Sequence, residues 1–472
     1  MSTQGNQITE AGMESRARSA AFRPEQFLDE RAALSCVHCG LCLAACPTYL
    51  ETGNENLSPR GRVYLMRQIQ SGRAPLDRLT VSPIDTCLGC LACQPACPAG
   101  IHYGELLETT RDFVERKFTR SLFEWVLRRV VIESVFAYPW RMRLALLPLK
   151  LLRSFGLERF LPKFARDAAG LVPTDAPRVD LPGVLPAQGE RKGRAGMIIG
   201  CVQSVLFGQT NAAAQRLLGR AGYEVVIPAD QGCCGALFSH SGRLDKAREC
   251  ARRNIEAFER QELDCVVVVG SGCGSTLKDY GHLLKDDPAW AARGKAFAAK
   301  VRDFVEVFPI PKRSPDSASD EAEPPKGSAC GAGCSPERLG RSATKELVTY
   351  HDACHLANPQ GIRQQPRDLI KAMCSEHFVE LPETELCCGS AGTYNLTQPA
   401  MAERLQERKI ANILRTGAKT VVTTNPGCLL QIQAGLRKSG HGDIEALHIA
   451  DFLERQMGEG ETPGPERGQE LR

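Results

Sequence analysis

Two long segments of the chain alternate between helix-like and strand-like patterns of apolar residues. Apolar positions recur at helical spacing in 211–222 (NAAAQRLLGRAG) and 402–417 (AERLQERKIANILRTG). Each is followed by a short β-branched run, 223–228 (YEVVIP) and 419–424 (KTVVTT). This alternation predicts α/β domains with mostly parallel strands.

The two segments also repeat the same cysteine landmarks. Each has a strand-like run ending at a cysteine, then a Cys-Cys-Gly, then an apolar strand that leads into a Gly-Cys turn. Equivalent cysteines are 153, 154 and 155 residues apart, and the landmarks are Cys201, Cys233, Cys234 and Cys273 in one segment and Cys354, Cys387, Cys388 and Cys428 in the other. The register predicts a duplicated domain. Loops that follow parallel strands meet at one end of the sheet, so we expect each set of cysteines to converge.

Composition makes cysteine the informative residue type. The 472 residues include 21 cysteines, and the first 20 residues lack the apolar run of a secretion signal. Clustered cysteines in a reducing compartment are more often metal ligands or redox groups than structural bridges. A stretch of 18 uncharged apolar residues is absent from the sequence, so no membrane-spanning helix is predicted.

A dense cysteine segment carries the clearest chemistry. Residues 36–47 (CVHCGLCLAACP) and 87–98 (CLGCLACQPACP) both fit C-x2-C-x2-C-x3-C-P, the spacing by which ferredoxins hold two 4Fe-4S clusters. In that arrangement the fourth cysteine of each run ligates the other cluster. We therefore assign one cluster to Cys36, Cys39, Cys42 and Cys97, and the other to Cys87, Cys90, Cys93 and Cys46. Structural zinc is the alternative, although zinc sites usually use two separated pairs of cysteines.

The residues around the two cysteine runs predict a mainly helical module. Residues 59–70 (PRGRVYLMRQIQ) have a helical pattern and carry Arg60, Arg62 and Arg67. These arginines either raise cluster potentials or dock a partner, or they form an ordinary solvated helix face. Two linker-like stretches follow later in the chain, at 172–194 and 311–344, where Pro, Gly and Ser interrupt the periodic pattern.

The region between the cysteine segment and the first linker is basic. From Arg111 to Asp167 there are 13 Lys and Arg against 6 Asp and Glu. Aromatic residues are not interleaved as in a stacking platform, which disfavours nucleic acid. The run 117–153 mixes these cations with large apolar residues, so it suits either an anionic membrane interface or packing onto protein. We expect Pro139 and Pro148 to break it into short helices.

Taken together, these motifs resemble one family. The repeats resemble the Cys-Cys-Gly domains of heterodisulfide reductase subunits, and the whole chain is similar to the iron-sulfur subunit of bacterial glycolate oxidase. The resemblance rests on CVHCGLCLAACPTY, SPRGRVYLMRQI, GCCGA, SGCG and CCGSAGTYNLTQP, and it covers roughly residues 20 to 455.

The resemblance implies an electron-transfer subunit of a flavin-dependent complex that oxidises glycolate, a 2-hydroxy acid, to glyoxylate. Flavoprotein partner subunits would hold the flavin and the substrate, and electrons would continue to a membrane acceptor such as quinone. No flavin and no catalytic residue are expected in this chain, which has neither a strand-linked G-x-G-x-x-G nor a P-loop. The implied location is cytoplasmic, with peripheral attachment to the inner face of the cytoplasmic membrane left open. The alternatives are the equivalent subunit of a lactate or anaerobic glycerol 3-phosphate dehydrogenase, or a heterodisulfide reductase-like protein.

The repeats depart from the fullest family pattern, which ends in C-x2-C. Gly270 and Asn425 stand where its first cysteine would be, which counts against a disulfide-reducing cluster. Four thiols per repeat still suffice for a metal or a further cluster; structural thiols in a docking scaffold and redox-active dithiols are the alternatives. His351 and His355 flank Cys354 as added ligands or as structural histidines. Three further cysteines are expected to be buried apolar groups: Cys250, Cys265 and Cys374. The linker cysteines Cys330 and Cys334 are expected to have no role.

The predicted organisation is thus multidomain: an α-helical two-cluster ferredoxin-like module, a helical region, and two duplicated α/β Cys-Cys-Gly domains. The expected boundaries are 1–20 (disordered tail), 21–110 (two-cluster domain), 111–171 (basic helical region), 172–194 (linker), 195–310 (Cys-Cys-Gly domain 1), 311–344 (disordered linker), 345–458 (Cys-Cys-Gly domain 2) and 459–472 (tail).

Overall fold

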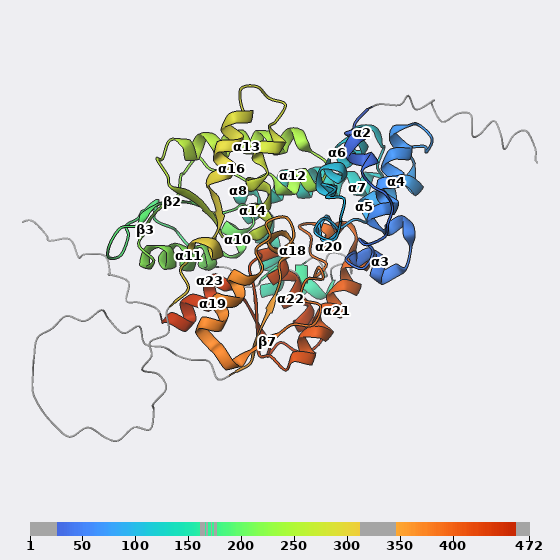
Figure 1. Cartoon of the computed structure of the whole chain (residues 1–472). Helices are drawn as coiled ribbons and strands as arrows, with labels where there is room; N and C mark the ends of the chain where they lie inside the picture. The colour runs from blue at the N-terminus through green and yellow to red at the C-terminus, as the bar shows by residue number, and fades with distance from the viewer. Residues whose placement is uncertain are drawn as a thin grey trace, which may run out of the picture. The chain divides into compact units, whose positions relative to one another are not determined.

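The structure is a computed structural model that describes residues 26–160, 166, 169–170, 172–173, 177–311 and 346–458. The two expected tails, together with Cys330 and Cys334, lie outside these residues. The chain divides into two compact units, one of residues 1–125 with 238–244 and one of residues 126–237 with 245–472. Figure 1 shows the elements of both.

The first unit is helical, and its described residues contain no strand. Its elements are α2 (Glu30–Leu34), α3 (Pro47–Thr52), η1 (Glu55–Leu57), α4 (Pro59–Gln70), α5 (Arg78–Asp85), α6 (Tyr103–Lys117) and α7 (Leu122–Trp125). Helix α4 has the bounds that the sequence predicts, because Ser58 caps the Gly61 amide and Pro59 occupies the first turn. Its buried face, Val63 and Met66, packs into a core that includes Cys87 and Cys93. The helical core therefore lies directly against the cysteine runs.

The expected basic region 111–171 is helical where it is described, but its expected start lies inside α6 and residues 111–125 belong to the first unit. The part that belongs to the second unit starts at Val126. It comprises η2 (Val126–Phe136), a π-helix, then α8 (Pro139–Ser154) and the 3-10 turn η3 (Leu157–Phe160). Pro139 starts α8, but Pro148 lies inside it, so the predicted break at Pro148 is wrong. Pro148 removes the hydrogen bond to the Leu144 carbonyl. Because Leu144 is 59% exposed, water can solvate that carbonyl and the helix continues.

The second unit contains two parallel sheets of the same core order. The first sheet has the order β1-β3-β2-β4-β5 and the second β7-β6-β8-β9, and all neighbours are parallel except β1 with β3. The strands are β1 (Val184–Leu185), β2 (Gly193–Ile198), β3 (Tyr223–Val226), β4 (Cys265–Val268), β5 (Val301–Asp303), β6 (Val348–His351), β7 (Phe378–Glu380), β8 (Thr420–Thr423) and β9 (Glu445–His448). The stretch 172–194 is therefore more than a linker, because β1 adds an edge strand to the first sheet.

Helices connect the strands of both sheets (Figure 1). The first domain has α10 (Gln203–Leu206), α11 (Gly208–Arg220), α12 (Ala236–His240), α13 (Leu244–Glu259), α14 (Ser271–Lys278), α15 (Tyr280–Leu283), α16 (Ala291–Lys300) and α17 (Phe304–Val307). The second has α18 (Cys354–Ala357), α19 (Gln364–Cys374), η5 (Ser375–His377), α20 (Tyr394–Thr397), α21 (Pro399–Thr416), α22 (Pro426–Lys438) and α23 (Ile449–Met457). The predicted helices at 211–222 and 402–417 are confirmed as α11 and α21.

The two α/β domains pack against each other through one shared hydrophobic core. Val267 of β4, Val422 of β8 and Phe452 of α23 all belong to it. Polar contacts join the same faces: Arg216 pairs with Glu454 through two bonds of 2.6 Å, and Ser271 Oγ donates to the Thr424 carbonyl at 2.8 Å. The repeats are therefore two halves of one packed body.

Candidate iron-sulfur and thiol sites

The two cysteine runs of the first unit have the same backbone shape. In each run the residues two and four positions after the first cysteine adopt left-handed φ angles: His38 (54°) and Gly40 (89°) in one, Gly89 (65°) and Leu91 (59°) in the other. A left-handed conformation costs a residue other than glycine about 1–2 kcal/mol. Both runs accept this cost at the residues that flank their second cysteine. The shared curvature turns the chain around a common centre, as ligation of a cluster by closely spaced thiolates requires.

One cavity gathers the thiols of the first predicted set. It has about 470 Å³ of empty space, part of it open solvent, and Cys36, Cys39, Cys42 and Cys97 all line it. Cys46 does not line it, although it is adjacent in sequence. Cys93 of the other run borders the same cavity, so the two sets are neighbours. The placement of Cys97 with the first run is what crossed ligation requires.

The second predicted set is more deeply buried than the first. Cys46, Cys87, Cys90 and Cys93 are all buried, whereas Cys39 is exposed. Burial raises the pKa of Cys93 well above its usual value, and nearby Cys90, Cys87, Cys46 and Cys42 raise it further in that order. Cys46 thus lies within electrostatic reach of the second run. Several thiols within electrostatic reach of one another in a dry site form a donor set that suits a cationic metal centre.

Hydrogen-bond donors converge on the buried set. The Tyr103 hydroxyl lies 3.5 Å from Cys87 Sγ and the Gly89 amide 3.4 Å from it. Burial opposes ionisation of Cys87, but the charges of Arg62 and Arg111 outweigh it, and the Cys87 pKa is lowered. These donors and charges stabilise negative charge on sulfur.

Arg62 is a cation buried among these thiols. It is 1% exposed and donates Nε to the Pro83 carbonyl (2.7 Å), Nη2 to Thr48 Oγ1 (2.9 Å) and Nη1 to Cys46 Sγ (3.8 Å). Burial disfavours the charged guanidinium, yet Cys87 and Cys46 raise its pKa overall. Arg60 differs, because it is more exposed and is paired with Glu55 at 2.6 Å. Arg62 thus lies among the buried thiols, whereas Arg60 lines the cavity of the first predicted set.

The first Cys-Cys-Gly domain brings its four predicted thiols together and adds a fifth. Cys201 Sγ lies 3.5 Å from Cys233 Sγ, and Cys234 is hydrogen-bonded to Cys233 and Cys273. Hydrogen bonds from Cys201, then Cys234 and Cys250, lower the Cys233 pKa well below its usual value. Cys250, on α13, is therefore part of the group and is not the isolated apolar residue that the sequence suggested.

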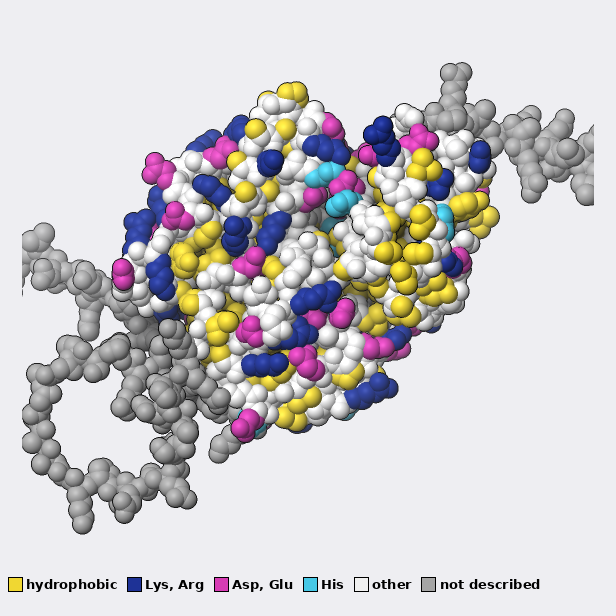
Figure 2. Space-filling model, viewed as in Figure 1, with side chains coloured by type: hydrophobic (Ala, Val, Ile, Leu, Met, Phe, Trp, Pro, Cys, Tyr) yellow, Lys and Arg dark blue, Asp and Glu magenta, His cyan; other side chains and the backbone are white. Residues whose placement is uncertain are grey.

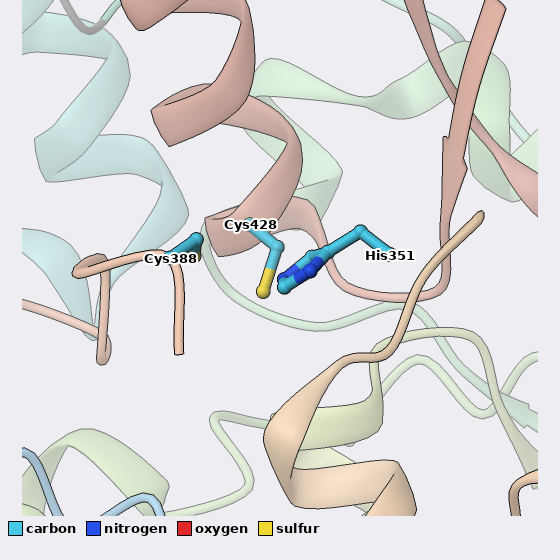
Figure 3. A group of neighbouring side chains, drawn as sticks. All are labelled: His351, Cys388 and Cys428. Carbon is cyan, nitrogen blue, oxygen red and sulfur yellow. The ribbon is translucent and has the colours of Figure 1, made fainter. Parts of the chain in front are cut away.

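The second Cys-Cys-Gly domain repeats the convergence with a different fifth member. Cys354 is hydrogen-bonded to Cys387, and Cys388 to both Cys387 and Cys428. The ligand atoms of His351, Cys388 and Cys428 all lie within 4.8 Å of one another, and all three residues are buried. In Figure 3 the His351 ring and the Cys428 thiol point toward each other, with Cys388 beside them.

His351 has the chemistry of a neutral ligand. Burial lowers its pKa well below the usual value, and the charge of Lys409 adds to this effect, while the Thr384 backbone opposes it. Neither ring nitrogen has a partner in good hydrogen-bond geometry, so the Thr384 backbone contact is a weak one. A buried neutral imidazole with two unsatisfied nitrogens beside two thiols fits a metal with mixed nitrogen and sulfur ligands, such as zinc.

Lys409 is a buried cation near the thiols of the second domain. It is 1% exposed and donates Nζ to the Glu383 carbonyl at 2.6 Å. Burial lowers its pKa to about 8, although thiolates of Cys388 and Cys387 act in the opposite direction. The hydrogen bond with Cys387 lowers the Cys388 pKa, but the bond with Cys428 and burial raise it well above its usual value, and the Lys409 charge acts against that rise.

The parallel strands place both thiol sets. Cys201 and Cys354 follow β2 and β6, the Cys-Cys pairs follow β3 and β7, and Cys273 and Cys428 lie at the start of α14 and α22, just after β4 and β8. The convergence expected from the sequence is therefore observed. Gly235 and Gly389 turn the Cys-Cys-Gly loops at φ of 90° and 87°, where a Cβ would approach Ala247 and Ala402. Gly270 and Asn425 occupy the N-caps of α14 and α22.

Other sequence expectations met mixed outcomes. Cys374 is buried, whereas Cys250 and Cys265 are half-buried. His355 is buried on α18, and its carbonyl accepts a bond from Gln360. Sequence reasoning missed the contact of Cys250 with the Cys-Cys pair of the first domain. Gly235 faces Ala247 and Cys250. In the second domain Gly389 faces Ala402 and Leu405, so Leu405 occupies the position equivalent to Cys250.

Comparison with known proteins gives matches over both units. A family described as "4Fe-4S dicluster domain" matches residues 32–101, and one described as "Cysteine-rich domain" matches residues 195–278 and 348–433. The dicluster module and the duplicated domain predicted from the sequence are thereby confirmed. In the described residues no helix has the length and apolar character needed to cross a membrane.

Relatives of known description cover most of the chain. It is 37% identical to "Probable glycolate oxidase iron-sulfur subunit" of Bacillus subtilis, over 90% of this chain and 94% of the relative. It is 33% identical to "Glycolate oxidase iron-sulfur subunit" of Escherichia coli, over 88% and 93%. "Lactate utilization protein A" of an Exiguobacterium species is 28% identical but covers only 54% of this chain, with 95% of its own length matched.

Proposed function

Since the chain belongs to the family of glycolate oxidase iron-sulfur subunits, we propose that it carries electrons within a flavin-dependent complex that oxidises glycolate or a close 2-hydroxy acid. Flavoprotein subunits deliver the electrons, and a membrane acceptor such as quinone receives them. A reduced flavin holds two electrons, and 4Fe-4S clusters, once bound, supply one-electron steps that can unload it.

Two observations support this proposal: the two cysteine runs have left-handed φ angles at matching positions, and one cavity brings Cys97 to the thiols of the other run. The cavity lined by Cys36, Cys39, Cys42 and Cys97 supports one ligand set, and the buried group of Cys87, Cys90, Cys93 and Cys46 supports the other. In this assignment each set draws its fourth thiol from the other run. This arrangement keeps two redox groups adjacent, which suits electron passage rather than bond-making chemistry.

The two thiol sets differ in their access to solvent, and this difference indicates where a redox partner exchanges electrons with the chain. Cys39 is exposed and the neighbouring Val37 and Leu41 are 72% and 60% exposed, so a redox partner reaches the first set at this surface. Hydrophobic side chains gather over the first unit on the face drawn in Figure 2, whereas charges are mixed elsewhere on that face. The second set is enclosed, and Arg62 and Tyr103 stabilise its negative charge.

The Cys-Cys-Gly domains have a second role in this proposal. Each offers a thiol set that fits a metal or a further cluster: Cys201, Cys233, Cys234 and Cys273 in the first, and Cys354, Cys387, Cys388 and Cys428 in the second. His351 makes the second set the better zinc site, while the five thiols of the first suit an iron-sulfur centre. Structural thiols and redox-active dithiols are the competing readings.

The runner-up functions have weaker support. Asn425 stands at the position where a disulfide-reducing cluster would need a cysteine thiolate, and its side-chain amide donates to Cys428 Sγ at 3.5 Å. Gly270 stands at the equivalent position of the first domain and supplies no thiolate either. The lactate relative matches little more than half of the chain. An anaerobic glycerol 3-phosphate dehydrogenase subunit remains the alternative that differs only in its flavoprotein partner.

The test is metal analysis of the anaerobically purified full chain, followed by capture of its partners. We expect about eight irons per chain and spin-coupled signals of two reduced clusters; a larger iron content indicates a further cluster in a Cys-Cys-Gly domain. Purification of the native complex should recover a glycolate-oxidising flavoprotein. Zinc without iron contradicts the electron-transfer proposal, and a glycerol 3-phosphate-oxidising partner contradicts the substrate assignment.

Crossed ligation has its own test. Cys46→Ser should alter the cluster held by Cys87, Cys90 and Cys93, and Cys97→Ser should alter the cluster held by the first run. If each substitution instead removes the cluster of its own run, the assignment is wrong. Electron paramagnetic resonance of the singly substituted chains separates the two results.

A further inference from the structure

Helix α8 presents a row of large apolar side chains to solvent. Trp140, Leu144, Leu147 and Leu151 are 61%, 59%, 57% and 61% exposed, and Phe155 just beyond the helix is 69% exposed. These positions recur at intervals of four, three and four residues, so they share one face of the helix. The inward side is marked by Met142, which is 4% exposed. A contiguous exposed stripe of this kind is unusual on a surface that only meets water.

Positive charge flanks the stripe on both sides. At 100° per residue, Arg141 falls on one flank and Arg143 and Lys150 on the other. From Ser134 to Leu157 the chain has four cationic residues and no Asp or Glu. This face therefore selects against a cationic surface and in favour of an anionic one.

Aromatic residues lie at the start of the helix in an arrangement that suits a boundary between water and lipid. The Arg141 guanidinium stacks 4.4 Å from the Tyr138 ring centroid and 5.1 Å from that of Trp140. The stacking holds a cation level with two amphipathic rings. Tyr and Trp rings with adjacent cations are enriched where polypeptides meet lipid headgroups.

The length and charge of α8 determine how it can meet a bilayer. Its 16 residues span about 24 Å at 1.5 Å per residue, which is shorter than the roughly 30 Å hydrocarbon core. With cations on its flanks it can lie in the plane of the interface and insert only its apolar face. A straight, one-sided stripe matches a flat anionic surface.

We propose that α8 docks this protein on an anionic phospholipid surface, with Trp140, Leu144, Leu147 and Leu151 in the headgroup boundary and Arg143 and Lys150 on lipid phosphates. The proposal deepens the proposed function and rests on it, because it names the surface through which the subunit reaches a lipid-soluble acceptor. Its lipid binding requires neither glycolate nor the flavoprotein.

The experiment is sedimentation of the full, cluster-loaded chain with two kinds of vesicle. One contains phosphatidylcholine with about 30% phosphatidylglycerol and the other phosphatidylcholine alone. We expect binding to the anionic vesicles at 0.1 M salt, and binding weaker by about tenfold or more at 0.5 M salt or with neutral vesicles. Leu147→Ser with Leu151→Ser should weaken it by about tenfold or more. Leu79→Ser, at a residue 83% exposed in the first unit, is the matched control and should bind as the unmodified chain does.

Fluorescence of Trp140 reports insertion directly. The chain has three tryptophans, so Trp125→Phe with Trp290→Phe leaves Trp140 as the single reporter. We expect a blue shift and quenching by brominated lipid on addition of anionic vesicles. Unchanged emission, or equal binding by the double-serine variant and the control, overturns the proposal. If the double-serine variant instead loses the flavoprotein while vesicle binding is absent, the stripe is a protein interface and the lipid proposal is wrong.

Cluster content and reduction separate this proposal from the function on which it rests. The double-serine variant should keep its iron and accept electrons from the flavoprotein in solution, because α8 contains no predicted ligand. Failed lipid binding with intact electron uptake refutes the docking surface alone. Absence of iron refutes the proposed function and leaves the lipid result to stand by itself.

Discussion

Replacing Arg62 tests whether a buried cation sets the potential of one cluster. Arg62 is 1% exposed and its Nη1 lies 3.8 Å from Cys46 Sγ. Arg62→Met removes that charge while keeping much of the side-chain volume. Because reduction adds negative charge beside the guanidinium, the variant should hold its electron less tightly, and the reduction potential should fall.

The size of the fall follows from Coulomb's law. Two unit charges about 4 Å apart interact by about 4 kcal/mol at an effective dielectric of about 20. The added electron is spread over the cluster and its thiolates, so roughly one third of this interaction, about 1.4 kcal/mol, is a reasonable share. For one electron that corresponds to about 60 mV. Loss of the hydrogen bond to the Pro83 carbonyl should also destabilise the fold by about 1–3 kcal/mol.

The assay is a redox titration of the anaerobic chain followed by electron paramagnetic resonance, with iron content measured on the same samples. Arg67→Gln is the matched control on the same helix, since Arg67 is half-buried and does not line the cavity of the first set; its shift should stay below about 20 mV. Crossed ligation places Cys46 and Cys87 on one cluster, so only one potential should move. A shift under about 20 mV with full iron content would refute the electrostatic reasoning, and equal shifts of both potentials would refute the ligand assignment.

Three further predictions address the second unit. Burial raises the pKa of Asp303 to about 7, from an ordinary value near 4, so its ionisation opposes folding: the penalty is absent at low pH, grows as pH rises from about 4 to 7, and is complete above 7. Asp303→Asn, which keeps the cap on Val305, should therefore raise the melting temperature at pH 8 more than at pH 5, with a gain of at most about 4 kcal/mol; an equal effect at both pH values contradicts this. His351→Ala should lower the zinc content of the purified chain and leave the iron of the first unit unchanged. If elemental analysis finds the same zinc content in the variant and the unmodified chain, or no zinc in both, His351 is not a metal ligand. Gly389→Ala should lower the free energy of unfolding by roughly 2 kcal/mol or more, because the new Cβ would lie 2.6 Å from the Ala402 carbonyl oxygen. The Cβ of Gly417→Ala would have its nearest contact 3.9 Å away, so this variant should lose only about 1 kcal/mol, from its left-handed φ. Similar urea midpoints for the two variants would contradict the steric argument.

Local patterns predicted much of the fold because they act over a few residues. The helix Pro59–Gln70 was predictable from its Ser-Pro start, and the strands of the repeats from their β-branched runs. The convergence of the thiols followed from a topological rule, since loops after parallel strands share one edge. Each of these features is determined by neighbours in sequence or by strand order.

The features that could not be predicted depend on contacts across the fold. Pro148 continues a helix because its surroundings are exposed, and β1 is a strand only because β3 offers it an edge. Cys250 joins a thiol group through the packing of α13 against the Cys-Cys-Gly loop, which a lone cysteine in a helical pattern does not reveal. The burial of Arg62 likewise depends on Pro83 and Thr48, which lie 21 and 14 residues away in the chain.

The packing of the two repeats on one core has a consequence for how their chemistry can diverge. In a symmetric pair of identical subunits, every substitution appears twice, and both centres must change together. Covalent linkage removes that constraint while the shared core keeps the pseudo-symmetric scaffold. One half of this chain carries Cys250 where the other carries Leu405, and in the second half the buried imidazole of His351 lies with Cys388 and Cys428. A single chain can therefore hold two chemically different centres at equivalent positions, whereas a pair of identical subunits would have the same residues at both.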